Sequence, residues 1–190
     1  MTATPELISA PAESAWTQEQ RDAFLEIAAG PRGALIGPFA PLLHSPGLLR
    51  PLQRTGEYIR WHSPVPERFR EMVILMVARH WDQGFEWTYH HPIAQTCGLS
   101  EETINAIGED RRPADLDESG SCVWALANEV LAHGTASEST VAEALRILGA
   151  QDVIEYVATV GYYSTLAFVM NVARTSVPDG PVLPPRQGLR

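Results

Sequence analysis

Residues 67–97 read ERFREMVILMVARHWDQGFEWTYHHPIAQTC, and this stretch decides the fold class. Its first half contains the run MVILMVA, which is too continuously apolar for the one-sided face of a surface helix. It therefore predicts a helix over residues 67–81 that is buried on nearly every side. Asp82-Gln83-Gly84 predicts a turn, and a second helix is expected from Phe85 to about Cys97. Because so short a turn makes neighbouring helices antiparallel, we expect a helical hairpin.

The rest of the chain also has helical patterns and almost no strand pattern. Thr17 and Gln20 predict a capped helix that closes at Gly30, and Pro46 is expected at the first position of a helix that runs to about Trp61. Further helices are expected at residues 101–107, 117–132, 137–148 and 151–174. Since no alternating apolar run is present, the sequence predicts an all-α, single-domain helical bundle.

Three parts are expected along the chain. Residues 1–36 hold an N-terminal helix and the segment that leads into the domain, and residues 37–175 form the helical domain. Residues 176–190 form a Pro/Gly-rich extended tail, either draped over a neighbour or frayed. Residues 97–101 and 148–152 each end one helix with glycine and begin another with a polar cap and an acid, which hints at duplicated helical hairpins.

Charge and composition limit the possible partners and location. The 190 residues carry a formal charge of −9, from 23 acidic and 14 basic side chains. Because such a surface repels phosphate backbones and anionic lipid, we expect no nucleic-acid partner and no membrane partner. The N-terminal sequence has no secretory pattern, and the two cysteines form no Cys-x-x-Cys pair, which predicts a cytoplasmic protein. The uncharged stretch Tyr156–Ala173 is long enough to cross a membrane, but its internal polar residues favour a buried central helix or an oligomer interface.

Glu71 is the first candidate for chemistry. It shares a helix face with Ile74, Leu75 and Ala78, so its carboxylate lies on an apolar stripe. A buried carboxylate needs a hydrogen bond, an ion pair or a proton. The alternative is a carboxylate in the first turn of the helix whose head reaches water, where the helix dipole favours an anion. The pattern alone leaves both interpretations open.

Glu86 and His90 lie four residues apart and therefore face the same way on the second helix. Ile93 and Cys97 continue this stripe, so an acid and an imidazole converge on an apolar face, as in an acid/base pair. The alternatives are a structural hydrogen bond within the helix and a metal site formed by Glu71, Glu86 and His90. Antiparallel pairing would place Glu71 nearer to His90 than to Glu86. The three residues are expected to line one pocket. Both cysteines are expected to be small buried hydrophobes.

These residues carry a resemblance. The run EMVILMVAR at 71–79, then Phe85-Glu86-Trp87-x-x-His90, then Gly98-Leu99-Ser100 and Ile104-x-x-Ile107, resembles the carboxymuconolactone decarboxylase family, which includes the alkylhydroperoxidase D (AhpD-like) branch. The resemblance covers the chain from about residue 37 to 173. In the peroxidase branch, a glutamate, a Cys-x-x-Cys pair and a histidine form the active site. Gln83 and Glu86 stand where the two cysteines would be, so thiol peroxidase activity is not expected.

The resemblance implies a carbon–carbon lyase of aromatic catabolism that needs no cofactor and no metal. It would act as a decarboxylase or isomerase on a small carboxylated lactone or related ring compound. His90 would be the general acid/base, Glu86 its partner or a second acid/base, Glu71 the orienting carboxylate, and Trp87 a pocket-lining residue. Relatives assemble as trimers or hexamers, so a homo-oligomer is expected. Two alternatives remain: a metal-assisted enzyme that uses Glu71, Glu86 and His90, and a non-catalytic oligomer that binds a small ligand.

Overall fold

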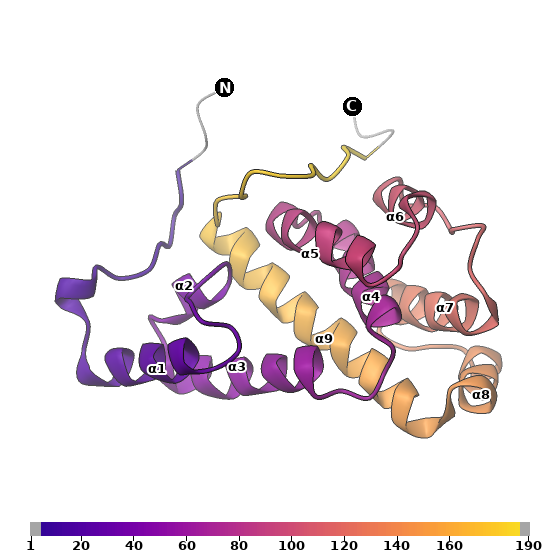
Figure 1. The fold of residues 1–190 in the computed structure, drawn as a ribbon, viewed down its shortest axis with the longest axis horizontal. Coiled ribbons are helices and arrows are strands. Elements are labelled where there is room, and N and C mark those ends of the chain that lie inside the picture. The colour runs from indigo at the N-terminus through magenta and orange to yellow at the C-terminus, as the bar shows by residue number, and fades with distance from the viewer. Residues whose placement is uncertain (1–4, 187–190) are drawn as a thin grey trace. The chain divides into compact units, whose positions relative to one another are not determined.

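The computed structural model describes residues 5–186, and these residues form an all-helical fold without β-strands (Figure 1). The all-α prediction is thus confirmed. The chain divides into two compact units. The first comprises the described residues up to Ser63 together with Thr165–Val177, and the second comprises Pro64–Ser164 and the tail from Pro178. The predicted limits at residues 36 and 175 stay predictions.

The first unit contains a 3₁₀ turn (Glu13–Ala15), α1 (Gln18–Ala29), α2 (Phe39–Leu42), α3 (Pro46–Trp61) and the end of α9 (Gly149–Ala173). Thr17 and Gln20 form the predicted capping box at the start of α1. Pro46 occupies the first turn of α3, also as predicted. The sequence analysis did not find the 3₁₀ turn or α2, because segments of three and four residues are too short to show a helical period.

The second unit contains α4 (Glu67–His80), α5 (Gly84–Thr96), α6 (Glu101–Gly108), α7 (Glu118–His133), α8 (Glu138–Ile147) and the first part of α9. Helix α4 packs against α5, α6 and α7. Every residue from Phe69 to Arg79 is buried, which confirms that MVILMVA lies in a helix covered on all sides. Three connecting residues, 81–83, join α4 to α5 and so bring the two helices together.

Glycine separates two pairs of helices, as the repeated sequence pattern predicts. Gly98 lies between α5 and α6, and Gly149 lies at the boundary of α8 and α9. Their φ angles of 92° and 83° belong to the left-handed region, which glycine enters without a Cβ clash. Because Gly149 makes this turn by itself, α9 begins there, two residues before the predicted start at Gln151.

Helix α9 is the segment whose composition is compatible with a membrane span. It is long and apolar enough to cross a membrane, and half of its most apolar 18-residue stretch is buried inside the protein. Tyr156 and Ala167 are among its buried residues, whereas Ile154, Phe168 and Val172 are exposed. The prediction of a buried helix therefore holds for one face of α9, and an apolar stripe remains on the other.

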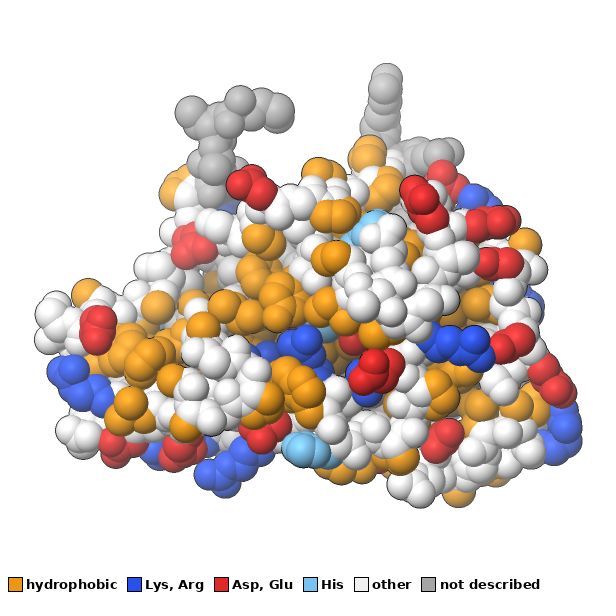
Figure 2. All heavy atoms as spheres, viewed as in Figure 1, with side chains coloured by type: hydrophobic (Ala, Val, Ile, Leu, Met, Phe, Trp, Pro, Cys, Tyr) orange, Lys and Arg blue, Asp and Glu red, His pale blue; other side chains and the backbone are white. Residues whose placement is uncertain are grey.

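On the face drawn in Figure 2, acidic and basic side chains are interspersed with hydrophobic ones.

The described part of the tail is extended, as predicted, and it is bonded to the second unit of its own chain rather than frayed. Its draping over a neighbour stays a prediction. The Thr88 hydroxyl donates to the Pro181 carbonyl at 2.8 Å, and Arg79 donates to the Pro184 carbonyl at 2.6 Å. Gly180 approaches Thr88 so closely that a Cβ there would lie 2.8 Å from the Thr88 methyl group. The tail carbonyls are free to accept these bonds because no helix uses them.

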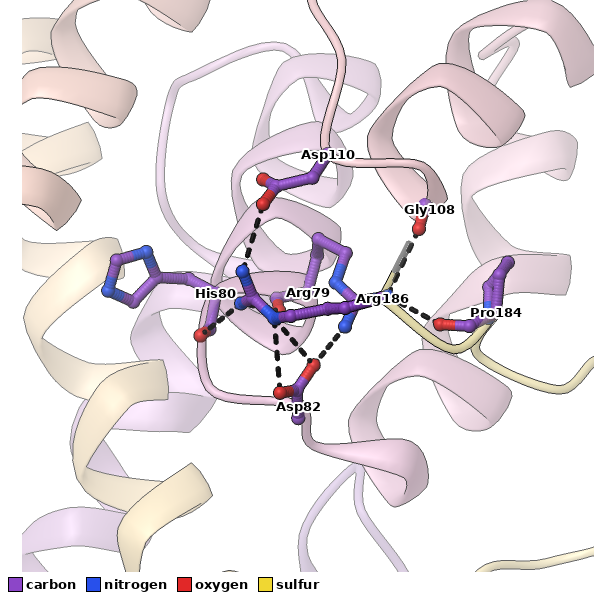
Figure 3. Close-up of polar contacts among 7 residues, drawn as sticks. All are labelled: Arg79, His80, Asp82, Gly108, Asp110, Pro184 and Arg186. Atoms are coloured by element: carbon purple, nitrogen blue, oxygen red, sulfur yellow. Dashed lines mark hydrogen bonds and ion pairs between the residues drawn. The ribbon is translucent and has the colours of Figure 1, made fainter. Parts of the chain in front are cut away.

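Arg186 anchors the end of the described tail (Figure 3). Its guanidinium donates to Asp82 at 3.1 Å, to Asp110 at 2.9 Å and to the backbone carbonyl of His80 at 2.8 Å. Asp82 also pairs with the buried guanidinium of Arg79. The tail thus joins the α4–α5 turn to the segment that follows α6.

Candidate functional site

A buried histidine between two buried carboxylates forms the candidate site. His90 Nδ1 lies 2.6 Å from Glu71 Oε2, and His90 Nε2 lies 3.3 Å from Glu86 Oε2. Glu71, Glu86 and His90 are only 1%, 3% and 2% exposed. The structure therefore resolves the alternatives for Glu71, because its head does not reach water. Glu71 contacts His90, as antiparallel pairing predicts, and the prediction that it lies nearer to His90 than to Glu86 stays a prediction.

Helix geometry explains this convergence. Glu71 lies in the second turn of α4, and the short connection to α5 returns the chain alongside it. Glu86 lies in the first turn of α5, one turn before His90, so their side chains meet along the same face. The Gln83 side chain accepts from the Phe85 amide at 2.6 Å and caps the start of α5. Capping fixes the first turn of the helix, which is the turn that carries Glu86.

The carboxylates decide the charge of His90. Burial opposes a charged ring, but attraction to Glu71 and hydrogen bonds to both carboxylates outweigh it and raise the pKa of His90 to about 8. At neutral pH the ring is therefore an imidazolium, with Nδ1–H donating to Glu71 and Nε2 in an ion pair with Glu86. Such charge-assisted bonds are stronger than neutral ones.

Aromatic rings and one arginine surround this triad. The rings of Tyr163 and Tyr89 contact His90 edge-on, with ring centroids 5.3 and 5.2 Å away. Arg70 is buried, and its Nε lies 3.9 Å from Glu71 Oε1. Arg70 was not among the site residues predicted from the sequence. A signal was present, because Arg70 immediately precedes Glu71 in a helix predicted to be covered on nearly every side.

Trp87 is buried next to Glu86 in the chain but faces another direction. Its ring contacts the ring of His91, with centroids 5.8 Å apart. A Cβ at Gly108 would lie 3.0 Å from the Trp87 ring, so the indole packs against the end of α6. The pocket-lining role expected for Trp87 stays a prediction.

The two cysteines lack the properties of reactive thiols. Cys97 is half-buried rather than buried as predicted, because it lies at the C-cap of α5, where its thiol donates to Glu67 at 3.6 Å. Burial, followed by the negative charges of Glu71 and Glu67, raises the pKa of Cys97. Cys122 is buried as predicted, and burial raises its pKa. Both thiols therefore stay protonated at neutral pH, which disfavours thiolate chemistry.

The geometry also disfavours the metal-assisted alternative. A metal ion needs a histidine nitrogen with a free lone pair, and both nitrogens of His90 face carboxylates at hydrogen-bonding distance. Within residues 5–186, no group of three or more His, Cys, Asp or Glu side chains is arranged to hold a metal ion. Two carboxylates on one imidazolium instead form a path along which a proton can move between Glu71 and Glu86 through the ring.

Comparison with known proteins identifies the fold. No protein-family model matches the sequence, and no curated protein matches it. Among solved structures, a protein of unknown function from Agrobacterium tumefaciens, named as a candidate antioxidant defence protein AhpD, aligns with a TM-score of 0.65 and 17% identity over 72% of this chain and 94% of that one. The debrominase Bmp8, a cysteine-to-alanine variant in complex with 2,3,4-tribromopyrrole, aligns with a TM-score of 0.71 and 12% identity over 93% of this chain and 94% of that one. At these identities the likeness shows the fold alone, and the chain has an AhpD-like helical fold.

Proposed function

We propose that this protein is a cofactor-free enzyme that uses Glu71, His90 and Glu86 for acid/base chemistry on a small carboxylated ring compound. The observation that carries the proposal is the imidazole of His90 held between two buried carboxylates, at 2.6 and 3.3 Å. Two further points support the substrate class. A debrominase with this fold binds 2,3,4-tribromopyrrole, which is a small ring. The sequence resemblance to the carboxymuconolactone decarboxylase family points to a lactone with a carboxylate.

The geometry favours one of the two roles left open for Glu86. Both ring nitrogens of His90 face carboxylates, so the ring has no free nitrogen to present to a substrate. Glu86 is then the group that contacts the reacting atoms, and His90 gives it a proton or takes one from it. Glu71 holds the ring through Nδ1, so that Nε2 points to Glu86. Glu86 is therefore the second acid/base rather than only a partner of His90.

Decarboxylation follows simply from these roles. The bond between the ring carbon and the substrate carboxylate breaks, carbon dioxide leaves, and the electron pair moves into the conjugated lactone carbonyl to form a dienolate. His90 Nε2–H passes its proton to Glu86, Glu86 protonates one carbon of the dienolate, and the neutral ring then takes a proton from solvent. The balance is one proton consumed and one carbon dioxide released, without oxidation or reduction. An isomerisation would use the same groups, with a proton removed from one carbon and returned to another.

The test is turnover of unsaturated γ-lactone carboxylates in D₂O. Nuclear magnetic resonance should detect a decarboxylated product with one deuterium, and a ¹³C-labelled carboxylate should appear as carbon dioxide and bicarbonate. Glu86→Gln and His90→Gln should lower the rate by about 10²- to 10⁴-fold, the usual contribution of general acid–base catalysis. Glu102→Gln, which changes an exposed carboxylate in the first turn of α6, is the matched control and should leave the rate unchanged.

Two outcomes would contradict the proposal. If Cys97→Ala or Cys122→Ala abolishes turnover while His90→Gln does not, the chemistry is that of a thiol. If the wild-type protein binds such lactones without turning them over, and substitutions at His90 change stability only, the protein is a ligand-binding oligomer.

A further inference from the structure

Arg70 is a buried charge whose hydrogen-bonding groups are largely unused. It lies on α4 directly before Glu71 and is 5% exposed. Its Nε is buried and has no hydrogen-bond partner among the described residues. The nearest carboxylate oxygens are at 3.5 Å, from Glu67 to Nη2, and at 3.9 Å, from Glu71 to Nε. A guanidinium carries five N–H donors, and a buried charge without hydrogen bonds is costly, so this position calls for an acceptor.

Tyr156 is a second buried donor in the same compact unit. Its side chain is 1% exposed, and its hydroxyl has no hydrogen-bond partner within the described part of the chain. Burial, followed by the negative charge of Asp152, raises the pKa of Tyr156, while the positive charges of Arg70 and Arg68 oppose this rise. Arg70 acts on Cys97 in the same way. The second unit thus holds two buried donors, Arg70 Nε and the Tyr156 hydroxyl, that have no hydrogen-bond acceptor among the described residues.

The chemistry of Arg70 indicates what is missing. A planar guanidinium matches the two oxygens of a carboxylate. Glu67 does not serve, because its side chain is 68% exposed and its oxygen lies 3.5 Å away. Glu71 is committed to His90 at 2.6 Å. The acceptor that Arg70 lacks is therefore an anion from outside the chain.

We propose that Arg70 binds the carboxylate of the substrate beside the Glu71–His90 pair. This inference rests on the proposed function, and it adds the residue that selects for an acidic substrate. Two other arginines, Arg111 and Arg68, are already paired with carboxylates. Arg111 donates to Glu109 at 2.8 Å, and Arg68 pairs with Asp117 at 2.7 Å. Arg70 differs from them in being buried, next to the acid/base residues and without a close partner.

The binding test uses 5-oxotetrahydrofuran-3-carboxylate and its methyl ester, which differ in the charged group. Titration calorimetry should show that the wild-type protein prefers the acid to the ester. Arg70→Gln should weaken acid binding by about 10- to 100-fold, the usual worth of a hydrogen-bonded charge, and should leave ester binding unchanged. Arg70→Lys should restore only part of the affinity, because an ammonium cannot bind a carboxylate in two parallel bonds. Arg68→Gln, two residues earlier on α4 and half-exposed, is the matched control and should bind the acid normally.

A measurement on the wild-type protein covers the case in which Arg70 variants do not fold. The Arg70 Nε–H resonance should move on titration with the acid and stay in place with the ester. An unmoved resonance at saturating acid, equal affinity for acid and ester, or unchanged acid binding in folded Arg70→Gln would each overturn the proposal. Acid binding through Arg70 without turnover of any lactone would leave this subsite standing and refute the proposed reaction. If Arg70→Gln turns over acidic substrates with the same KM as the wild-type protein, the proposed reaction stands and the Arg70 subsite is refuted.

Discussion

The stability of the protein should fall as pH rises through the range in which His90 loses its proton. The pKa of His90 is raised from 6.5 to about 8 in the folded protein. Between these two values the folded chain holds a proton that the unfolded chain releases, so unfolding becomes easier with increasing pH. The difference of about 1.5 units corresponds to about 2 kcal/mol of unfolding free energy, present in full below pH 6.5 and lost above pH 8.

Two other histidines do not obscure this effect. Burial lowers the pKa values of His80 and His91, so their protonation opposes folding as pH falls below their ordinary range. Their contribution therefore has the opposite sign and lies at lower pH. Between pH 6.5 and 8 the decline in stability belongs to His90, because the two thiols, whose pKa values are also raised, lower stability only as pH approaches 9.

The assay is urea unfolding, followed by tryptophan fluorescence, at several values from about pH 6 to about pH 9. His90→Gln should remove the decline, whereas His62→Gln, which changes an exposed histidine, should retain it. If wild type and His90→Gln show parallel curves, or if wild-type stability increases over this range, His90 is not an imidazolium held by two carboxylates. The reasoning about the site would then be refuted together with the proton path through the ring.

Three further predictions concern assembly and the tail. We expect light scattering to show a homo-oligomer, either a trimer or a hexamer. The double substitution Ile154→Glu and Val172→Glu, on the exposed apolar stripe of α9, should yield monomers. A wild-type protein that is monomeric at micromolar concentration would contradict this prediction. Arg186→Gln should lower the unfolding free energy by about 1–3 kcal/mol, because it removes hydrogen bonds to the carboxylates of Asp82 and Asp110. Amide hydrogen exchange in the tail that is as slow as in the wild-type protein would show that Arg186 does not hold the tail. Gly180→Ala should release the tail from the second unit, because the new Cβ would lie 2.8 Å from the Thr88 methyl group. If limited proteolysis cuts the tail of the variant no faster than that of the wild-type protein, the close approach is disproved.

Local signals in the sequence account for most of the fold. Thr17, Ser100, Asp117 and Ser137 each accept a hydrogen bond from a backbone amide and cap the start of a helix. The helix limits agree closely because capping depends only on neighbouring residues. The Glu71–His90 contact was also predictable, since a three-residue connection restricts how two helices can pair.

Contacts between distant parts of the chain were beyond this reasoning. A charged side chain in a helix is normally read as solvated, so Arg70 did not emerge as a buried group until the packing of α4 was known. The anchoring of the tail was not predicted for a similar reason. Its proline and glycine content correctly excluded a helix, but composition does not reveal that Arg186 reaches Asp82.

The tail anchor has a consequence for the timing of folding during synthesis. Asp82 and Arg186 are 104 residues apart, so a ribosome that adds about 5–20 residues per second needs on the order of 5–20 s to proceed from one to the other. During this interval Arg79 lacks the Pro184 carbonyl that it bonds in the folded protein. The end of α4 therefore stays open to water or to a chaperone until the tail has been translated.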